Sequence, residues 1–67
     1  MIVFDPFWKT LKEKNMSVET LITKYNISEN TINRLRENKE VSTLLLNKLC
    51  NILHCNVQDI FEYVPEK

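Results

Sequence analysis

Apolar residues recur along this chain at helical spacings of three and four, in short blocks separated by polar breaks. In the first block Phe7, Trp8 and Leu11 fall on one face of a helix. Asp5 and Pro6 stand before them as an N-cap and a residue of the first turn. This block predicts the first helix, with charged residues on its opposite face.

Two more blocks lie in the second half of the chain. One follows Ser42 and has the widest apolar face, formed by Leu45, Leu46, Leu49, Cys50 and Leu53. The other follows Asn56, with Asp59 as a capping partner and Pro65 at its end. Its apolar residues are Ile60, Phe61 and Val64. Together with two helices in the middle of the chain, the pattern predicts five helices and no strand.

The middle of the chain holds two short helical patterns joined by a tight break. Their inward positions are Leu21, Ile22, Ile27, Ile32 and Leu35. The second pattern spans about residues 29–37, and its outer face carries polar side chains that hydrogen-bond base edges. This arrangement predicts a helix-turn-helix unit and indicates DNA as the partner.

Each predicted helix is bounded by residues that suit helix ends in a chain without glycine. The predicted N-caps are Ser17, Ser28 and Ser42. Asparagine enters the left-handed region at low cost, so helices are predicted to end at Asn15, Asn26 and Asn38. His54, near the end of the fourth helix, is expected to interact with the helix dipole.

The apolar N-terminal segment 2–4 leaves three interpretations open. It can form an extended arm, pack onto the first helix, or contribute to a subunit interface. The sequence contains no internal repeat, linker or low-complexity tract. We therefore expect residues 1–67 to form a single domain with one core.

The composition is that of a folded chain, because 43% of the 67 residues are hydrophobic. Nine basic and nine acidic residues cancel, so the net positive charge typical of strong DNA binding is absent. This balance fits modest DNA affinity that depends on dimerisation, and it equally fits binding to another protein. No apolar run approaches the roughly 20 residues that cross a bilayer, and no signal-peptide pattern is present, so we expect a cytoplasmic protein without a membrane partner.

The sequence argues against catalysis. The absence of glycine excludes glycine-rich phosphate loops, dinucleotide fingerprints and strained nucleophile elbows. The one histidine has no Ser or Asp arrangement beside it, and so short a chain has little room for a water-excluding pocket. We expect a protein that is not an enzyme and has no cofactor.

Cys50, His54 and Cys55 suggest a metal site, because Cys50 and His54 lie four residues apart on one helical face. A closed zinc site needs a fourth ligand, and the chain has no other cysteine or histidine. We therefore expect core thiols and no metal. A disulfide between residues five apart across a helix end is not expected either.

These segments resemble the Cro/CI-type (lambda-repressor-like) helix-turn-helix family, and in particular its small stand-alone members. The resemblance rests on the opening Phe7–Leu11, the elbow Tyr25–Ser28 before Thr31 and Ile32, and the ending Leu49–Pro65. It implies a five-helix lambda-repressor-like DNA-binding domain with a central helix-turn-helix. Family members are bacterial or phage transcriptional regulators that commonly bind two-fold operators as dimers. The resemblance therefore implies a small regulator of double-stranded DNA, most simply a repressor.

Three positions depart from the family pattern. Ile22 stands where the family usually has alanine, so we expect a wider spacing between the two central helices. Asn26 replaces the usual glycine of the elbow and can adopt the same turn. Val18 replaces the usual glutamine, which removes one side-chain contact to phosphate.

Carried over residue by residue, the resemblance implies two sets of DNA contacts around a recognition helix in the major groove. The base-reading set is Ser28, Glu29, Asn30, Asn33 and Arg34. The backbone set is Val18, Arg36, Asn38, Lys39, Ser42 and Thr43. Asparagine pairs with adenine, arginine with guanine, and glutamate accepts from cytosine, while the N–H groups that begin the fourth helix suit a phosphate.

We expect a homodimer, at least on DNA. The predicted interface is the apolar end formed by Phe61, Tyr63 and Val64, followed by segment 2–4. The alternative function is a protein-interaction module on the same fold that binds another regulator or an antitoxin-like partner. The sequence shows no ligand-sensing segment, so we expect no small-molecule ligand.

Overall fold

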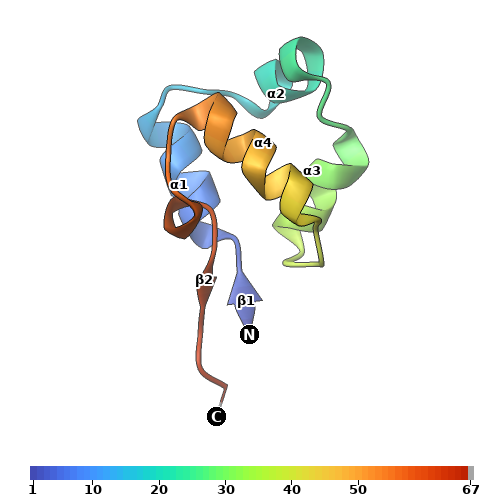
Figure 1. The fold of residues 1–67 in the computed structure, drawn as a ribbon. Helices are drawn as coiled ribbons and strands as arrows, with labels where there is room; N and C mark the ends of the chain where they lie inside the picture. The colour runs from blue at the N-terminus through green and yellow to red at the C-terminus, as the bar shows by residue number, and fades with distance from the viewer. Residues whose placement is uncertain (67) are drawn as a thin grey trace.

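The computed structural model describes residues 1–66. Its helices are α1 (Asp5–Glu13), α2 (Val18–Tyr25), α3 (Glu29–Arg36) and α4 (Thr43–Leu53), followed by one 3₁₀ turn, η1 (Val57–Asp59). Two short strands, β1 (Ile2–Val3) and β2 (Glu62–Tyr63), pair antiparallel. The helices form one bundle, and the strands lie side by side beneath it, next to both termini (Figure 1). No described helix is long and apolar enough to span a bilayer.

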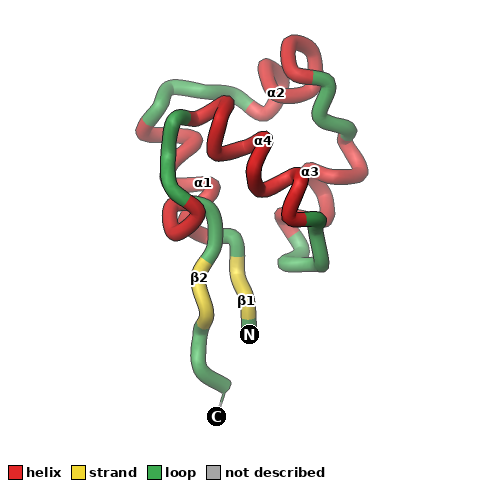
Figure 2. The backbone as a smooth tube through the Cα atoms, viewed as in Figure 1, coloured by secondary structure: helices red, strands yellow, loops and turns green. Residues whose placement is uncertain are grey.

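The predicted fifth helix is wrong, and so is the prediction of a chain without strands. The capping box is present, since the Asn56 N–H donates to Asp59 Oδ2 at 3.1 Å, but it supports only one turn. Ile60 then enters the core, and its carbonyl accepts from the Phe7 N–H at 3.1 Å. With this carbonyl bonded to α1, the chain leaves as an extended strand instead of a helix, as the tube in Figure 2 shows.

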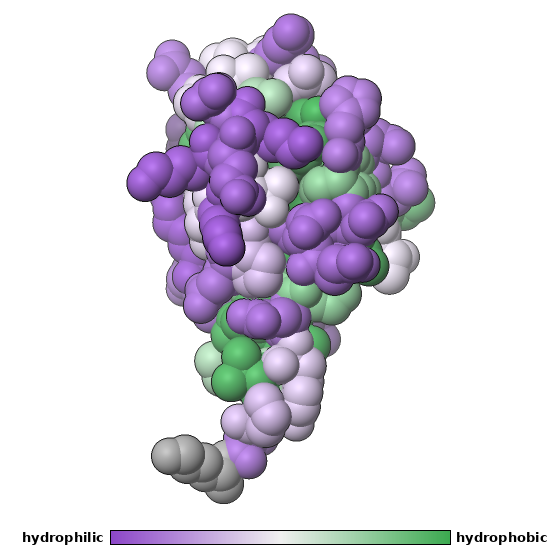
Figure 3. All heavy atoms as spheres, turned by 90° about the vertical axis from the view of Figure 1, so that its left-hand side faces the viewer, coloured by the Kyte–Doolittle hydropathy of each residue, from purple (hydrophilic) through white to green (hydrophobic). Residues whose placement is uncertain are grey.

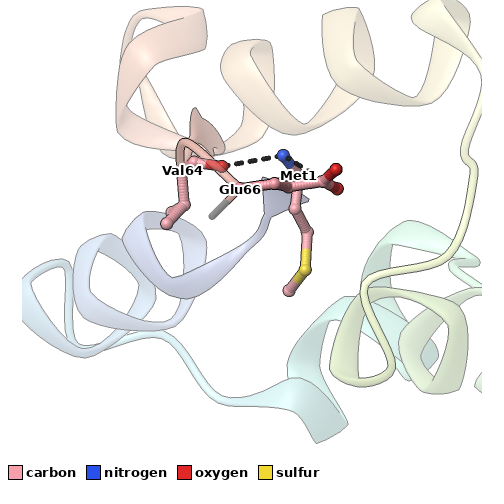
Figure 4. Close-up of polar contacts among 3 residues, drawn as sticks. All are labelled: Met1, Val64 and Glu66. Atoms are coloured by element: carbon pink, nitrogen blue, oxygen red, sulfur yellow. Dashed lines mark hydrogen bonds and ion pairs between the residues drawn. The ribbon is translucent and has the colours of Figure 1, made fainter.

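Segment 2–4 begins as an extended arm and ends at Phe4, which is buried in the core with Phe7 of α1, while its part in a subunit interface stays a prediction. Ile2 pairs with Tyr63 and Val3 with Glu62. Figure 4 shows the terminal amino group, which donates to the Val64 carbonyl at 2.8 Å and lies 3.6 Å from the Glu66 carboxylate. We call the paired segments 1–3 and 62–64 the terminal ribbon. Its ion pair is exposed and therefore contributes little to stability.

Asp5 does not cap α1. The helix begins at Asp5, its N-cap is Phe4, and no side chain of the N-cap bonds the first turn. The Phe4 N–H instead donates to Asn38 Oδ1 at 2.8 Å, so a residue after α3 ties the arm to the bundle. The acidic Asp5 and the ring of Pro6 both lie in the first turn, where each is favourable.

The three serine caps are confirmed. Each accepts from the N–H three residues on, at 3.1 Å. The three asparagine helix ends are also confirmed, with φ of 54° at Asn15 and 57° at Asn26 and Asn38. A fourth left-handed residue, His54, ends α4 with φ 52°. Histidine is less common than asparagine in the left-handed conformation. From the sequence His54 is expected only to interact with the helix dipole, and its role in ending α4 is not predicted.

The core lies where the helices meet. Its fully buried side chains are Phe7, Leu21, Ile32, Leu35, Leu49, Leu53 and Ile60. Ile27 at the elbow is also buried, as predicted, whereas Ile22 is only half-buried. On α4 only Leu49 and Leu53 of the predicted apolar face are buried. Its other members, Leu45, Leu46 and Cys50, are partly buried against the core. Every helix thus contributes to one core, which fixes the orientation of α3.

Candidate nucleic-acid interface

The elbow between α2 and α3 is built from three residues, 26–28. Asn26 turns the chain in the left-handed conformation, and the Ile27 N–H donates to the Leu21 carbonyl at 3.0 Å. Ile27 is 3% exposed and fills the angle between the helices. Ser28 then begins α3 by accepting from the Thr31 N–H. The elbow is therefore held by hydrogen bonds and by a buried side chain.

The outer face of α3 is polar and faces solvent. Ile32 and Leu35 are buried, and the exposed residues of the helix are Glu29, Asn30, Asn33 and Arg36. In Figure 1 α3 lies along the outside of the bundle. Amide and guanidinium groups on an accessible helix are the groups that read base edges in a major groove. The structure thus brings three predicted base-reading residues, at positions 29, 30 and 33, onto one open face.

Arg34 is less free than predicted. It is half-buried, and its Nε donates to the Glu40 carbonyl at 2.8 Å, so the loop before α4 holds one edge of the guanidinium. The exposed Lys39 follows on the same loop, with its Nζ 3.3 Å from the Glu37 carboxylate. These contacts place two cations where α3 ends, next to the start of α4.

A groove of about 870 Å³ runs from these cations to the terminal ribbon. Arg34, Lys39 and Ser42 line its polar part. Its apolar part is lined by Met1, Ile2, Phe4, Val41, Leu45, Leu46 and Phe61. The groove therefore joins the candidate phosphate contacts to the predicted interface residue Phe61.

Arg36 links α1 to the face of α3. Its guanidinium carbon lies 5.6 Å from the centroid of the Trp8 ring, within range of a cation–π contact. Its Nη1 donates to Asn33 Oδ1 at 3.3 Å. With this oxygen engaged, the exposed Asn33 side chain keeps its two amide N–H donors for other partners. From the sequence Trp8 is expected only on the apolar face of the first helix, and the sequence offers no signal for a contact between positions so far apart.

Several predicted contact residues also have structural roles. Ser28 and Ser42 cap helices, and the Oδ1 of Asn38 holds the arm. Val18 is half-buried and, with Ile22, lines a cavity of about 310 Å³ between α2 and α3. Thr43, the first residue of α4, is exposed. Because the hydroxyl groups of Ser28 and Ser42 are used as caps, these serines offer a phosphate their backbone N–H groups.

Two helices joined at a tight elbow, with the polar face of the second one open to solvent, define a helix-turn-helix DNA-binding domain. Residues 7–66 match the sequence profile of the Cro/C1-type HTH DNA-binding domain, and the chain belongs to this family. This family is a DNA-binding domain and not a class of enzymes. The resemblance inferred from the sequence is thereby confirmed.

Among solved structures the chain is similar to the transcriptional regulator VanUg. The TM-score is 0.86 at 31% sequence identity, over 97% of this chain and 87% of that chain. No curated protein sequence matches the chain significantly. The family and this neighbour together establish a helix-turn-helix domain of the kind found in transcriptional regulators.

Proposed function

We propose that the chain is a sequence-specific transcriptional regulator that places α3 in the major groove of double-stranded DNA. The observation that carries this proposal is the open polar face of α3, opposite a buried face and next to a three-residue elbow. In this proposal residues 1–67 act as one domain, of which Lys67 lies outside the described residues. The regulator acts in the cytoplasm, without a cofactor, a metal or a small-molecule ligand, and represses by covering its operator.

The base-reading set comprises Ser28, Glu29, Asn30, Asn33 and Arg34. Asn30 has no side-chain partner among the described residues' hydrogen bonds and suits bidentate pairing with adenine. Asn33, with its oxygen held by Arg36, acts as a donor toward acceptors such as guanine O6 or thymine O4. Glu29 accepts from cytosine. Arg34 keeps its two terminal amino groups for guanine while Glu40 fixes the rest of its side chain.

The backbone set positions the helix. Lys39 and Arg36 supply the positive charge, and the N–H groups of Ser42 and Thr43 meet a phosphate at the start of α4. Asn38 and Val18 contribute through their position beside the helix and not through a free side-chain oxygen. Because the chain is neutral overall, a few local cations must provide most of the salt-dependent affinity.

Dimerisation is proposed to use the terminal ribbon. Six large apolar side chains of residues 1–66 are exposed, and four of them, Met1, Ile2, Tyr63 and Val64, belong to the ribbon. Figure 3 shows a green apolar patch where the molecule begins to taper, among other smaller apolar patches on a largely polar face. The free strand edges are also open to pairing with a second copy. Phe61 supports this end from inside, with its ring 6.2 Å from that of Phe4. A two-fold dimer of this kind would read a two-fold operator.

A protein-interaction module is the second candidate function. The neutral net charge and the partly apolar groove favour it. In this version the groove and the ribbon bind another regulator or an antitoxin-like partner, and the face of α3 stays unoccupied.

Selection from a random duplex library tests the proposal. We expect a two-fold motif to be enriched at low salt, and its binding to weaken steeply as salt rises. Arg34→Ala/Lys39→Ala should abolish most binding, because it removes one base contact and one phosphate contact, and the lost phosphate contact should flatten the salt slope by about one unit. Lys9→Ala/Lys12→Ala is the matched control, because it removes the same charge from exposed positions on α1. Failure to enrich any sequence, or equal losses in both variants, would favour the protein-interaction function.

A further inference from the structure

The two cysteines meet where α4 ends. Cys50 lies in the last turn, His54 turns the chain in the left-handed conformation, and Cys55 follows. The Cys55 N–H donates to the Cys50 carbonyl at 3.2 Å. This six-residue closure is the Schellman motif, which is frequently accompanied by a contact between the side chains of its first and last residues.

The same closure occurs at two other helix ends, with different chemistry. The Met16 N–H donates to the Leu11 carbonyl at 3.0 Å, and the Lys39 N–H to the Arg34 carbonyl at 2.9 Å. The closing residues there are an apolar pair and a basic pair. At the end of α4 both closing residues are cysteines, and they are the only two in the chain.

The two thiols interact. Both are free and partly accessible. Burial is the largest cause that raises the pKa of Cys55 to about 11, and the charge of the neighbouring Cys50 adds to it. At neutral pH Cys55 therefore keeps its proton.

The backbone meets the distance requirement of a disulfide. A disulfide joins residues whose α-carbons lie within about 7 Å of each other. The direct hydrogen bond, with standard bond lengths on either side, holds the two α-carbons within about that limit. No disulfide between residues five apart is expected from the sequence, and both cysteines are free in the structure; the left-handed turn at His54 nevertheless folds Cys55 back toward Cys50.

We propose that Cys50 and Cys55 are a redox modification site that closes to an intramolecular disulfide in reaction with a low-molecular-weight disulfide such as oxidised glutathione. One cysteine, as thiolate, attacks a glutathione sulfur, breaks the S–S bond and releases one glutathione thiol. The other cysteine then attacks the mixed disulfide and releases the second. The protein gives up two protons and two electrons, and the oxidant becomes two glutathione molecules.

This site is independent of the proposed DNA contacts. Neither cysteine belongs to the base-reading or the backbone set, and the phosphate contact proposed on α4 is at the start of that helix, whereas the dithiol lies at its opposite end. Metal binding is less well supported, since no three His, Cys, Asp or Glu side chains of residues 1–66 form a metal-ligating group.

The test is to treat the folded full-length chain with oxidised glutathione and measure its mass. We expect the chain to lose two hydrogen atoms, to gain no glutathione, and to recover with dithiothreitol. Tryptic digestion localises the change, because no Lys or Arg separates the cysteines and both fall in one peptide after Lys48. Cys50→Ser and Cys55→Ser should instead retain one glutathione as a mixed disulfide.

A denatured sample supplies the control for geometry. The disulfide should close faster in the folded chain than in urea, because the fold holds the thiols together. Stable glutathione adducts on the folded wild-type chain, disulfide-linked dimers, or closure at the same rate in urea would each overturn the proposal. None of these readouts depends on DNA binding.

Discussion

The helix-turn-helix and the terminal ribbon present opposite surfaces and are stabilised in different ways. The elbow and the caps of α2 and α3 use hydrogen bonds between residues at most six positions apart. The ribbon joins residues up to 63 positions apart. The first unit exposes amides and charges, and the second exposes apolar side chains. The local unit therefore carries the polar face proposed to read DNA, and the non-local unit carries the apolar surface proposed to bind a second copy of the chain.

The largest expected effect comes from the core under α3. Leu35→Ala removes a fully buried side chain and should lower the free energy of unfolding by about 2–5 kcal/mol. Leu44→Ala is the matched control, because Leu44 is 80% exposed and its loss should change stability by less than about 0.5 kcal/mol. Urea unfolding followed by circular dichroism measures both. Similar losses would contradict the assignment of the buried face.

The next effect concerns the open face of α3. Asn33→Ala should weaken binding to the selected operator by about 1–3 kcal/mol and relax specificity at one base pair, because one direct contact is lost. Trp8→Leu should reproduce part of that relaxation by releasing Arg36. Competition binding with single-base operator variants measures the change. A uniform loss over all sequences would instead assign Asn33 to the phosphate backbone.

The ribbon is tested by its most exposed aromatic residue. Tyr63→Ser, at a side chain that is 65% exposed, should weaken self-association about tenfold, roughly 1.4 kcal/mol, without unfolding the monomer. Val57→Ser serves as control, since Val57 is 46% exposed but lies outside the ribbon. Sedimentation equilibrium over a range of concentrations measures the association. If the wild-type chain stays monomeric at every concentration and on DNA, the ribbon has another role.

Substitution of the left-handed residues Asn26 and His54 tests whether the helix ends, including the elbow of the helix-turn-helix, depend on local backbone conformation. Asn26→Ala should cost about 1–2 kcal/mol of stability, because alanine is disfavoured at a φ of 57°. Asn26→Gly should be nearly neutral, and His54→Gly should stabilise the chain, since glycine adopts this conformation freely. Thermal unfolding of the three variants provides the comparison. Equal stability of the alanine and glycine variants would show that the elbow does not depend on this conformation.

The smallest effect appears only in alkali. Burial raises the pKa of Cys55 from 9.0 to about 11, so the folded chain holds this proton more tightly than the unfolded chain does. The resulting contribution to stability is complete below pH 9 and is lost as the pH rises toward 11. Cys55→Ser should therefore show a shallower loss of stability over this interval. A constant difference in the free energy of unfolding between wild type and Cys55→Ser from pH 9 to 11 would contradict the raised pKa of Cys55.

Features that depend on hydrogen bonds between near neighbours were predicted correctly from the sequence, and features that depend on distant residues were not. Ser17, Ser28 and Ser42 were identified as caps because a hydroxyl needs only a backbone N–H three residues away. Asn15, Asn26 and Asn38 were identified because few residue types tolerate a positive φ. The cap of α1 was assigned to the wrong residue because the N-cap is Phe4, whose N–H donates to Asn38 Oδ1 far along the chain.

The candidate site was predicted in composition but not in detail. The sequence placed positions 29, 30 and 33 on the open face of a helix, and they lie there. It did not show that Glu40 holds Arg34, or that Trp8 and Arg36 orient the Asn33 amide. These contacts depend on the path of a loop and on the packing of α1 beside α3.

By itself the sequence determined the two central helices, their elbow and the family, because these depend on helical periodicity and on hydrogen bonds between near neighbours. Only the tertiary structure decided the end of the chain. Asn56 and Asp59 favour a helix equally well with or without neighbours, but the Phe7 N–H captures the carbonyl of Ile60 and β1 offers a strand to pair with. A short helix with few internal hydrogen bonds is marginal on its own, so these partners brought from the other end of the chain outweigh its local preference.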